Sequence, residues 1–207
     1  EAWSEERLAE LGEITMLVGE PEPPADLVRL LKVALANEIS VSELAAVWMP
    51  STAEWEIKIG LAQQGGDEAR HFNLVEGRLS QLGVSLADFV VPDENELFAY
   101  LKSLQTSVEK VAAGPFMLEL IAYKVNDNFI HYCQQFGDSA TVSLYTNFIQ
   151  PDELHHHHMG RMLLEKYAIT PDAQRLVREA AAKTFELTAD LRRLAAQKLG
   201  TDSFPGC

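Results

Sequence analysis

Cysteine is scarce in this chain of 207 residues, which contains only Cys133 and Cys207. The two cysteines have no C-x-x-C spacing, so they supply neither a disulfide framework nor a four-thiolate iron site. The first residues, EAWSEERLAE, are too acidic for a secretory signal peptide. We therefore expect a reducing, cytoplasmic location.

Positive charge and long apolar runs are also in short supply. Seventeen Lys and Arg face 31 Asp and Glu, which gives a net charge of −14. Such a surface repels nucleic acids and anionic membranes, so neither is expected as a partner. No apolar run approaches the length that spans a bilayer. With 47% hydrophobic residues, the chain suits one globular domain over 1–207 with a substantial core.

The alternation of apolar and polar residues that marks strands is rare, whereas apolar residues recur every three or four positions. The sequence therefore predicts an all-α fold, with helix ends set by proline, glycine and capping residues. We expect a short helix before Pro21, long helices over about 25–49, 53–82, 115–136 and 140–167, a shorter one over 94–112, and a last one over 171–199. The segment 85–114 would then be a long crossover between two helical hairpins.

One pattern occurs twice in the predicted long helices: Asp67-Glu68-x-x-His71 and Asp152-Glu153-x-x-His156. A Glu and a His three residues apart lie on one face of a helix, about one turn from each other. Each pair can therefore ligate one metal ion. A single Glu-x-x-His is a weak signal because many surface helices contain one, but two in corresponding hairpins are more specific.

Two further carboxylates complete the set. Glu38 interrupts an apolar stripe on the first long helix, at a depth from the turn near Ser51 that resembles that of Glu68. In the second hairpin, Glu119 lies about as far before the turn at Gly137 as Glu153 lies after it. Glu43 is the alternative on the first helix, but it sits beside a serine and can face water. The predicted metal ligands are Glu38, Glu68, His71, Glu119, Glu153 and His156.

Carboxylates on the inward faces of helices are costly to bury unless positive charge compensates them, and two metal cations would do so. Asp67 and Asp152 are placed to accept the second ring N–H of a ligating histidine from the paired helix. Tyr123, one turn after Glu119, is a candidate hydrogen-bond donor or redox-active neighbour, although an inward tyrosine is more often plain core.

Breaks near the two motifs leave alternatives open. Pro151 removes a backbone hydrogen bond before the second motif, and a distorted helix there would make His157 the ligand in place of His156. His155 and His158 are better explained as surface residues or as residues that contact the ligands from outside. Gly65-Gly66 precedes the first motif, and indicates either close helix packing or a local opening for substrate or dioxygen.

Taken together, the residues Glu38, Asp67-Glu68-Ala69-Arg70-His71, Glu119 and Asp152-Glu153-Leu154-His155-His156 resemble the ferritin-like di-iron carboxylate superfamily over about 25–167. The resemblance implies a four-helix bundle with a long crossover, to which this chain adds helices at both ends. It also implies two iron ions, with manganese or a mixed manganese–iron pair as alternatives, and dioxygen as co-substrate. Glu68 and Glu119 would bridge the metals by pairing symmetry.

The expected function is an oxygenase or oxidase that oxidises a small organic molecule with electrons from an external donor. The alternative is metal handling or peroxide removal, as in ferroxidases, rubrerythrin-like proteins or manganese catalases. The missing C-x-x-C pair argues against an ordinary rubrerythrin. A metal-free helical scaffold is a third reading, which the complete set of ligands disfavours. Outward apolar residues on the terminal helices permit a homodimer.

Overall fold

The computed structural model describes residues 25–87, 89–201, 203 and 205–206, and these are helical or lie in loops and turns, without a strand. The predicted all-α class is therefore confirmed for this part of the chain. The short helix expected before Pro21 lies outside the described residues. Among the described helices, none is both long enough and apolar enough to cross a membrane.

The first hairpin consists of α2 (Ala25–Trp48) and α3 (Trp55–Gln81). Helix α2 ends where Pro50 follows, and the Thr52 hydroxyl donates to the carbonyl of Trp48 at 2.8 Å. The two helices pack closely at Gly65, where an added Cβ would lie 3.2 Å from that of Ala45. Helix α3 is continuous through the glycine pair. Gly65 thus allows close helix packing and does not mark an opening.

The crossover contains two short helices, α4 (Glu96–Ser103) and α5 (Ser107–Val111). We expected one helix over 94–112, but Leu104 adopts an extended backbone and ends α4. Thr106 and Glu109 then form a capping box that starts α5. The local capping residues thus override the continuous apolar spacing.

The second hairpin contains two π-helical segments. The π-helix η1 (Ala112–Leu118) leads into α6 (Glu119–Gln135), and after the turn at Gly137, α7 (Ser139–Leu144) leads through η2 (Tyr145–Ile149) into α8 (Gln150–Tyr167). Each π segment stands directly before a helix that contains a predicted metal ligand. Short π segments inside α-helices are frequent at functional sites.

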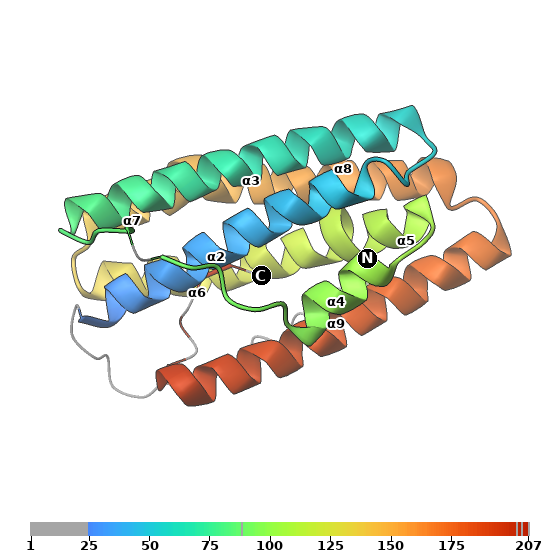
Figure 1. Ribbon diagram of the computed structural model, residues 1–207. Helices are drawn as coiled ribbons and strands as arrows, with labels where there is room; N and C mark the ends of the chain where they lie inside the picture. Colours follow the sequence, from blue (N-terminus) through green and yellow to red (C-terminus); the bar gives the residue numbers. More distant parts are fainter. Residues whose placement is uncertain (1–24, 88, 202, 204, 207) are drawn as a thin grey trace.

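Helices α2, α3, α6 and α8 run side by side, and α9 (Pro171–Leu199) lies along the outside of η1, α5 and α4 (Figure 1). Two large apolar clusters and a smaller one around Ile121 fill the interior. The two large clusters lie on either side of the predicted ligands. One surrounds Trp48, Leu101 and Leu118, and the other surrounds Leu31 and Phe129. Along α2 and α3, the residues of these two clusters are separated by Glu38 and Glu68, so the predicted ligands interrupt the core.

Candidate metal centre

Four helices bring all six predicted ligands into the interior. Glu38 comes from α2, Glu68 and His71 from α3, Glu119 from α6, and Glu153 and His156 from α8. Each of these residues is at most 5% exposed. Four carboxylates in one buried cluster need compensating positive charge, because the free energy of taking an unpaired ion out of water is large.

The six side chains form two overlapping groups of four. One group is Glu38, Glu68, His71 and Glu153, and the other is Glu68, Glu119, Glu153 and His156. Within each group, one ligand atom from every residue lies within 4.8 Å of the others. Glu68 and Glu153 belong to both groups, whereas Glu38 and Glu119 belong to one each. The geometry thus favours Glu68 and Glu153 as the shared carboxylates, and differs from the pairing of Glu68 with Glu119 that symmetry suggested.

Both histidines turn Nδ1 toward the carboxylates. Nδ1 of His71 lies 3.2 Å from Glu68 Oε2 and 3.5 Å from Glu38 Oε2. Nδ1 of His156 lies 3.2 Å from Glu68 Oε1 and 3.6 Å from Glu153 Oε2. The same nitrogen in both rings is therefore available to a metal, and Nε2 is left for a different partner.

That partner is an aspartate from the other motif. Nε2 of His71 lies 3.0 Å from Asp152 Oδ2, and Nε2 of His156 lies 3.2 Å from Asp67 Oδ2. With Nε2 protonated, each ring donates to its aspartate and offers the lone pair of Nδ1 inward. Arg70 joins the two pairs at the surface, because its Nη2 donates to both Asp67 and Asp152.

Burial and mutual contact shift the pKa values of the cluster strongly. Burial raises the pKa of Glu38 to about 8, against the lowering effect of its hydrogen bond with His71. Burial alone would raise the pKa of Glu68 and lower that of His71. The close approach of His156 and His71 instead lowers the pKa of Glu68, and Glu38 and Glu68 raise the pKa of His71 to about 12. Protons thus supply the positive charge that metal ions would supply when bound.

Several buried polar atoms in the cluster have no hydrogen-bond partner. They are Oε1 of Glu68, Oε2 of Glu153 and Nδ1 of His156. The first and third of these atoms lie only 3.2 Å apart, yet they do not form a hydrogen bond. Buried polar atoms are normally satisfied, so atoms that approach one another without pairing fit a shared cation. The donor set of imidazole and carboxylate suits iron, manganese or zinc.

Gln64 is a part of the site that the sequence did not reveal. It lies one turn before Glu68 on α3, is 2% exposed, and donates from Nε2 to Oε1 of Glu119. Its position on the inward stripe of α3 was the available signal. The amide fixes the orientation of a carboxylate that belongs to only one of the two groups.

Tyr123 does not enter the site, contrary to its expected role. Its side chain is half-buried, Lys124 lies over its ring, and its backbone carbonyl accepts from Gln150. The inward face of α6 passes instead through Ala122 and Asn126, which are buried. Tyr123 therefore lies on the flank of the helix.

Tyr145, the first residue of η2, is the buried tyrosine near the cluster. Its side chain is fully buried and its hydroxyl has no hydrogen-bond partner. Burial, followed by the charge of Glu38, raises the pKa of this hydroxyl well above its usual value. No role was predicted for Tyr145 from the sequence, because its inward orientation depends on the π segment.

The remaining alternatives do not belong to the two ligand groups. Glu43 is exposed on the outer side of α2. His157 does not replace His156: its Nδ1 lies 2.7 Å from the carbonyl oxygen of Phe116, and its ring stacks on Phe116. It thus ties α8 to η1. His155 and His158 are exposed, as expected.

Comparison with known proteins identifies the family of this chain. A family model described as "Protein of unknown function (DUF455)" matches residues 38–194, which include all six clustered side chains. No curated protein and no solved structure matches the chain significantly. Since the family model covers most of the chain, this protein belongs to the DUF455 family.

Proposed function

We propose that the protein is a di-iron oxidoreductase that activates dioxygen to oxidise a small organic substrate. The observation that carries the proposal is the pair of overlapping ligand groups, in which Glu68 and Glu153 serve both positions. Two-metal sites in proteins have ions roughly 3.5–4 Å apart. Shared carboxylates are suited to hold two ions at such a distance.

The arrangement of the helices supports the same proposal. Two hairpins, α2–α3 and α6–α8, contribute the ligands, and the segment with α4 and α5 connects them. One Glu from each of two helices and a Glu-x-x-His from each of the other two is the ligand pattern of ferritin-like di-iron and di-manganese proteins. We therefore assign the fold to the ferritin-like class as part of the proposal.

The protein's own residues have distinct tasks in this scheme. Bound iron supplies the redox chemistry with dioxygen. Asp152 and Asp67 fix the tautomers of His71 and His156, and Gln64 holds Glu119 in place. The apolar clusters on both sides of the ligands exclude water from the centre.

The proposal also includes the source of the electrons and the location of the protein in the cell. The described residues contain one cysteine, Cys133, which is buried with a free thiol. We infer an external electron donor, because this single thiol cannot supply an electron pair through a disulfide within the described chain. A cytoplasmic location agrees with a thiol that stays reduced.

The test is metal analysis followed by turnover. Protein reconstituted anaerobically with Fe²⁺ should hold two iron ions per chain, and with reductant and dioxygen it should oxidise members of a panel of small organic molecules. Failure to bind more than trace metal would overturn the proposal. Formation of ferric mineral alone would show iron handling, and vigorous release of dioxygen from peroxide by the manganese form would show a catalase.

A further inference from the structure

The chain returns to the interior after α9. Gly200 ends that helix in a left-handed conformation, and Pro205 and Gly206 are buried again. In Figure 1 the end of the described chain lies in the middle of the molecule, beside α2 and α6. Residues from three helices, α2, α6 and α9, contact Gly206. A main-chain peptide thus occupies a position where a folded domain normally places side chains.

Both polar groups of Gly206 are bound by side chains. Its N–H donates to Oδ1 of Asn126 at 2.9 Å, and its carbonyl accepts from Nη1 of Arg192 at 3.2 Å. Asn126 and Arg192 are 1% and 6% exposed. The two side chains therefore form a buried acceptor and donor pair that matches the N–H and C=O of one amide.

One member of this pair, Asn126, shares a helix face with a ligand. Asn126 is on α6, seven residues after Glu119, which corresponds to roughly 10 Å along the helix and to the same face. Asn37 directly precedes Glu38 and contacts Gly206 from α2. A molecule that replaced Gly206 would thus be held by residues that share helices with the ligands Glu38 and Glu119.

The surroundings have polar capacity that Gly206 does not use. Nδ2 of Asn126 and Oγ1 of Thr184 are buried without a hydrogen-bond partner. Thr184, Thr188 and Arg192 follow one another at four-residue spacing on the buried face of α9. Because unpaired buried polar atoms are costly, Nδ2 of Asn126 and Oγ1 of Thr184 indicate a site that can accept a larger polar group than one peptide unit.

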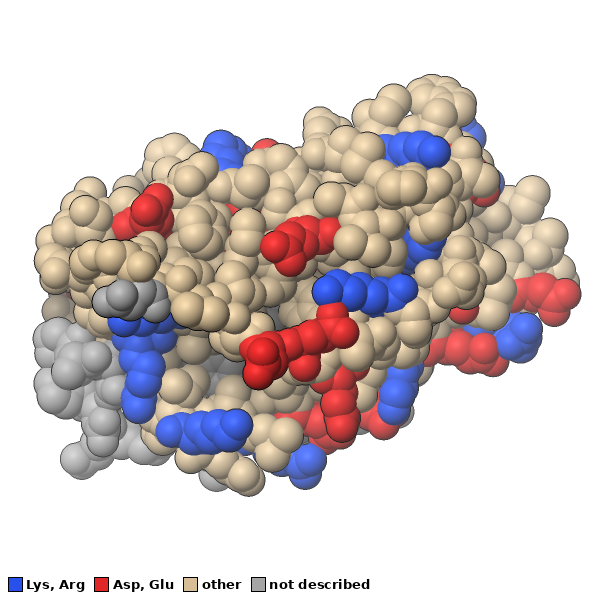
Figure 2. Space-filling view, in the orientation of Figure 1, with Lys and Arg blue, Asp and Glu red and all other residues tan. Residues whose placement is uncertain are grey.

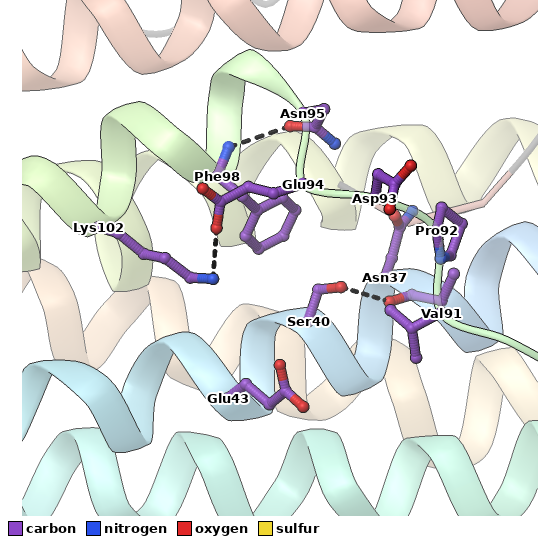
Figure 3. Close-up of a pocket in the computed structure, with 11 residues that line it drawn as sticks. Asn37, Ser40, Glu43, Val91, Pro92, Asp93, Glu94, Asn95, Phe98 and Lys102 are labelled. Atoms are coloured by element: carbon purple, nitrogen blue, oxygen red, sulfur yellow. Dashed lines mark hydrogen bonds and ion pairs between the residues drawn. The ribbon is translucent and has the colours of Figure 1, made fainter.

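Asn37 also lines a surface pocket. It has a volume of about 180 Å³ and is bounded by α2, the segment before α4, and α4 itself. Figure 3 shows Asn37 and Asp93 on one side of this pocket and Glu43, Glu94 and Lys102 on the other, with Glu94 paired with Lys102. Acidic side chains also gather in the middle of the face drawn in Figure 2. This approach repels anions, which opposes the attraction of Arg192 for a carboxylate. The acceptor Oδ1 of Asn126 needs an N–H, which a carboxylate lacks, so a neutral amide is favoured.

We propose that Asn126 and Arg192 form a substrate subsite that binds the amide group of a small neutral molecule, and that the Gly206 peptide occupies this subsite in the closed form. The proposal rests on the proposed function for the reaction that follows binding. Substrate displaces Gly206, and Asn37 both lines the surface pocket and contacts Gly206. The Gly206 peptide keeps water out until then.

Gly206 provides a way to open the subsite. It has φ of +84°, and an added Cβ would lie 2.6 Å from Nδ2 of Asn37. Gly200 has φ of +73°, but its Cβ would have open space. The variants Gly206→Ala and Gly200→Ala therefore carry similar backbone strain, and only the first has a steric conflict in the subsite.

Hydrogen exchange on the metal-free protein tests the displacement. We expect the backbone amide of residue 206 to exchange at least about tenfold faster in Gly206→Ala than in wild type. This factor corresponds to the loss of one hydrogen bond of about 1.4 kcal/mol. Gly200→Ala should change this exchange rate much less. Equal acceleration in both variants would overturn the role of the steric contact, because strain alone would then explain it.

Binding of matched probes tests the chemistry. N-methylpentanamide carries both the N–H and the C=O of an amide. Methyl pentanoate lacks the N–H, and pentanoate carries a negative charge. In metal-free Gly206→Ala we expect the amide to bind about tenfold more tightly than the ester, because the ester leaves Asn126 Oδ1 unpaired. Asn126→Leu in this background should remove that preference. The amide should also bind more tightly to Gly206→Ala than to wild type, where Gly206 competes.

Three results would overturn the subsite. They are no amide binding to Gly206→Ala when exchange shows that Gly206 has moved, equal binding of amide and pentanoate, and a preference that survives Asn126→Leu. Far-ultraviolet circular dichroism confirms that each variant is folded. Since these measurements need no metal, their failure leaves the metal content and the turnover assay to decide the proposed function separately.

Discussion

Nε2 of His71 on α3 lies 3.0 Å from Oδ2 of Asp152 on α8, the aspartate that directly precedes the other motif's glutamate. The reverse contact, from His156 to Asp67, measures 3.2 Å. Each Asp-Glu-x-x-His motif therefore supplies a ligand pair to the cluster and orients the histidine of the other motif. The two helices cannot be displaced relative to each other without changing both histidines.

The first prediction concerns this contact. Asp152→Asn should lower metal affinity by about 10–100-fold, because the amide holds the imidazole less firmly and no longer increases its basicity. Competition with a chelator, measured by isothermal titration calorimetry, gives the affinity. Asp190→Asn, which alters an exposed aspartate paired with Arg193, should leave it unchanged. Equal affinity of Asp152→Asn and wild type would show that the contact does not support the centre.

The four glutamates should differ in how much metal they control. Glu38 and Glu119 belong to one ligand group each, so Glu38→Gln and Glu119→Gln should each retain about one ion. Glu68 and Glu153 belong to both groups, so their Gln variants should retain fewer ions than the first two. Elemental analysis of reconstituted protein after gel filtration gives the ratio of metal to chain. Loss of both ions from all four variants would contradict the division into two groups.

The inward positions of the ligands could be predicted because helical periodicity and turn positions depend on local sequence. Glu38 and Glu119 interrupt apolar stripes, and the structure places both beside the two Glu-x-x-His pairs. The contacts of Asp67 and Asp152 with the histidines also follow from the repeat of one motif in two facing helices.

Other features depend on tertiary contacts that no local pattern contains. The π segments change the register of the helix before α6 and α8, which explains why Tyr145 rather than Tyr123 is buried near the ligands. The position of Gly206 depends on residues from three helices. Neither feature alters the apolar spacing from which the helices were predicted.

The third prediction concerns the contact of α8 with the π segment before α6. Gly160 lies so close to η1 that an added Cβ would be 2.7 Å from the backbone of Pro115 and Phe116. Gly160→Ala should lower the free energy of unfolding by about 1–3 kcal/mol, because backbone atoms must move apart. Urea unfolding followed by circular dichroism measures the change.

Gly77→Ala is the matched control for this variant. Gly77 is also helical, but an added Cβ there meets nothing within 4 Å. Alanine should raise the free energy of unfolding by up to about 1 kcal/mol through its higher helix propensity. If Gly160→Ala proved as stable as wild type, the close approach of α8 and η1 would be absent in solution.

The last prediction is that metal uptake releases protons. Burial raises the pKa of Glu38 to about 8, and contact with Glu38 and Glu68 raises that of His71 to about 12 against the effect of burial. Both groups therefore carry protons at pH 7 and must lose them to ligate a metal, so affinity should increase with pH. Titration with Mn²⁺ under anaerobic conditions, in buffers of different ionisation enthalpy, counts the protons. The number released should fall by most of one between pH 6.5 and pH 8.5, because Glu38 has then largely lost its proton before metal arrives, whereas His71 has not. A release that stays constant over this range would show that Glu38 does not titrate in the metal-free protein.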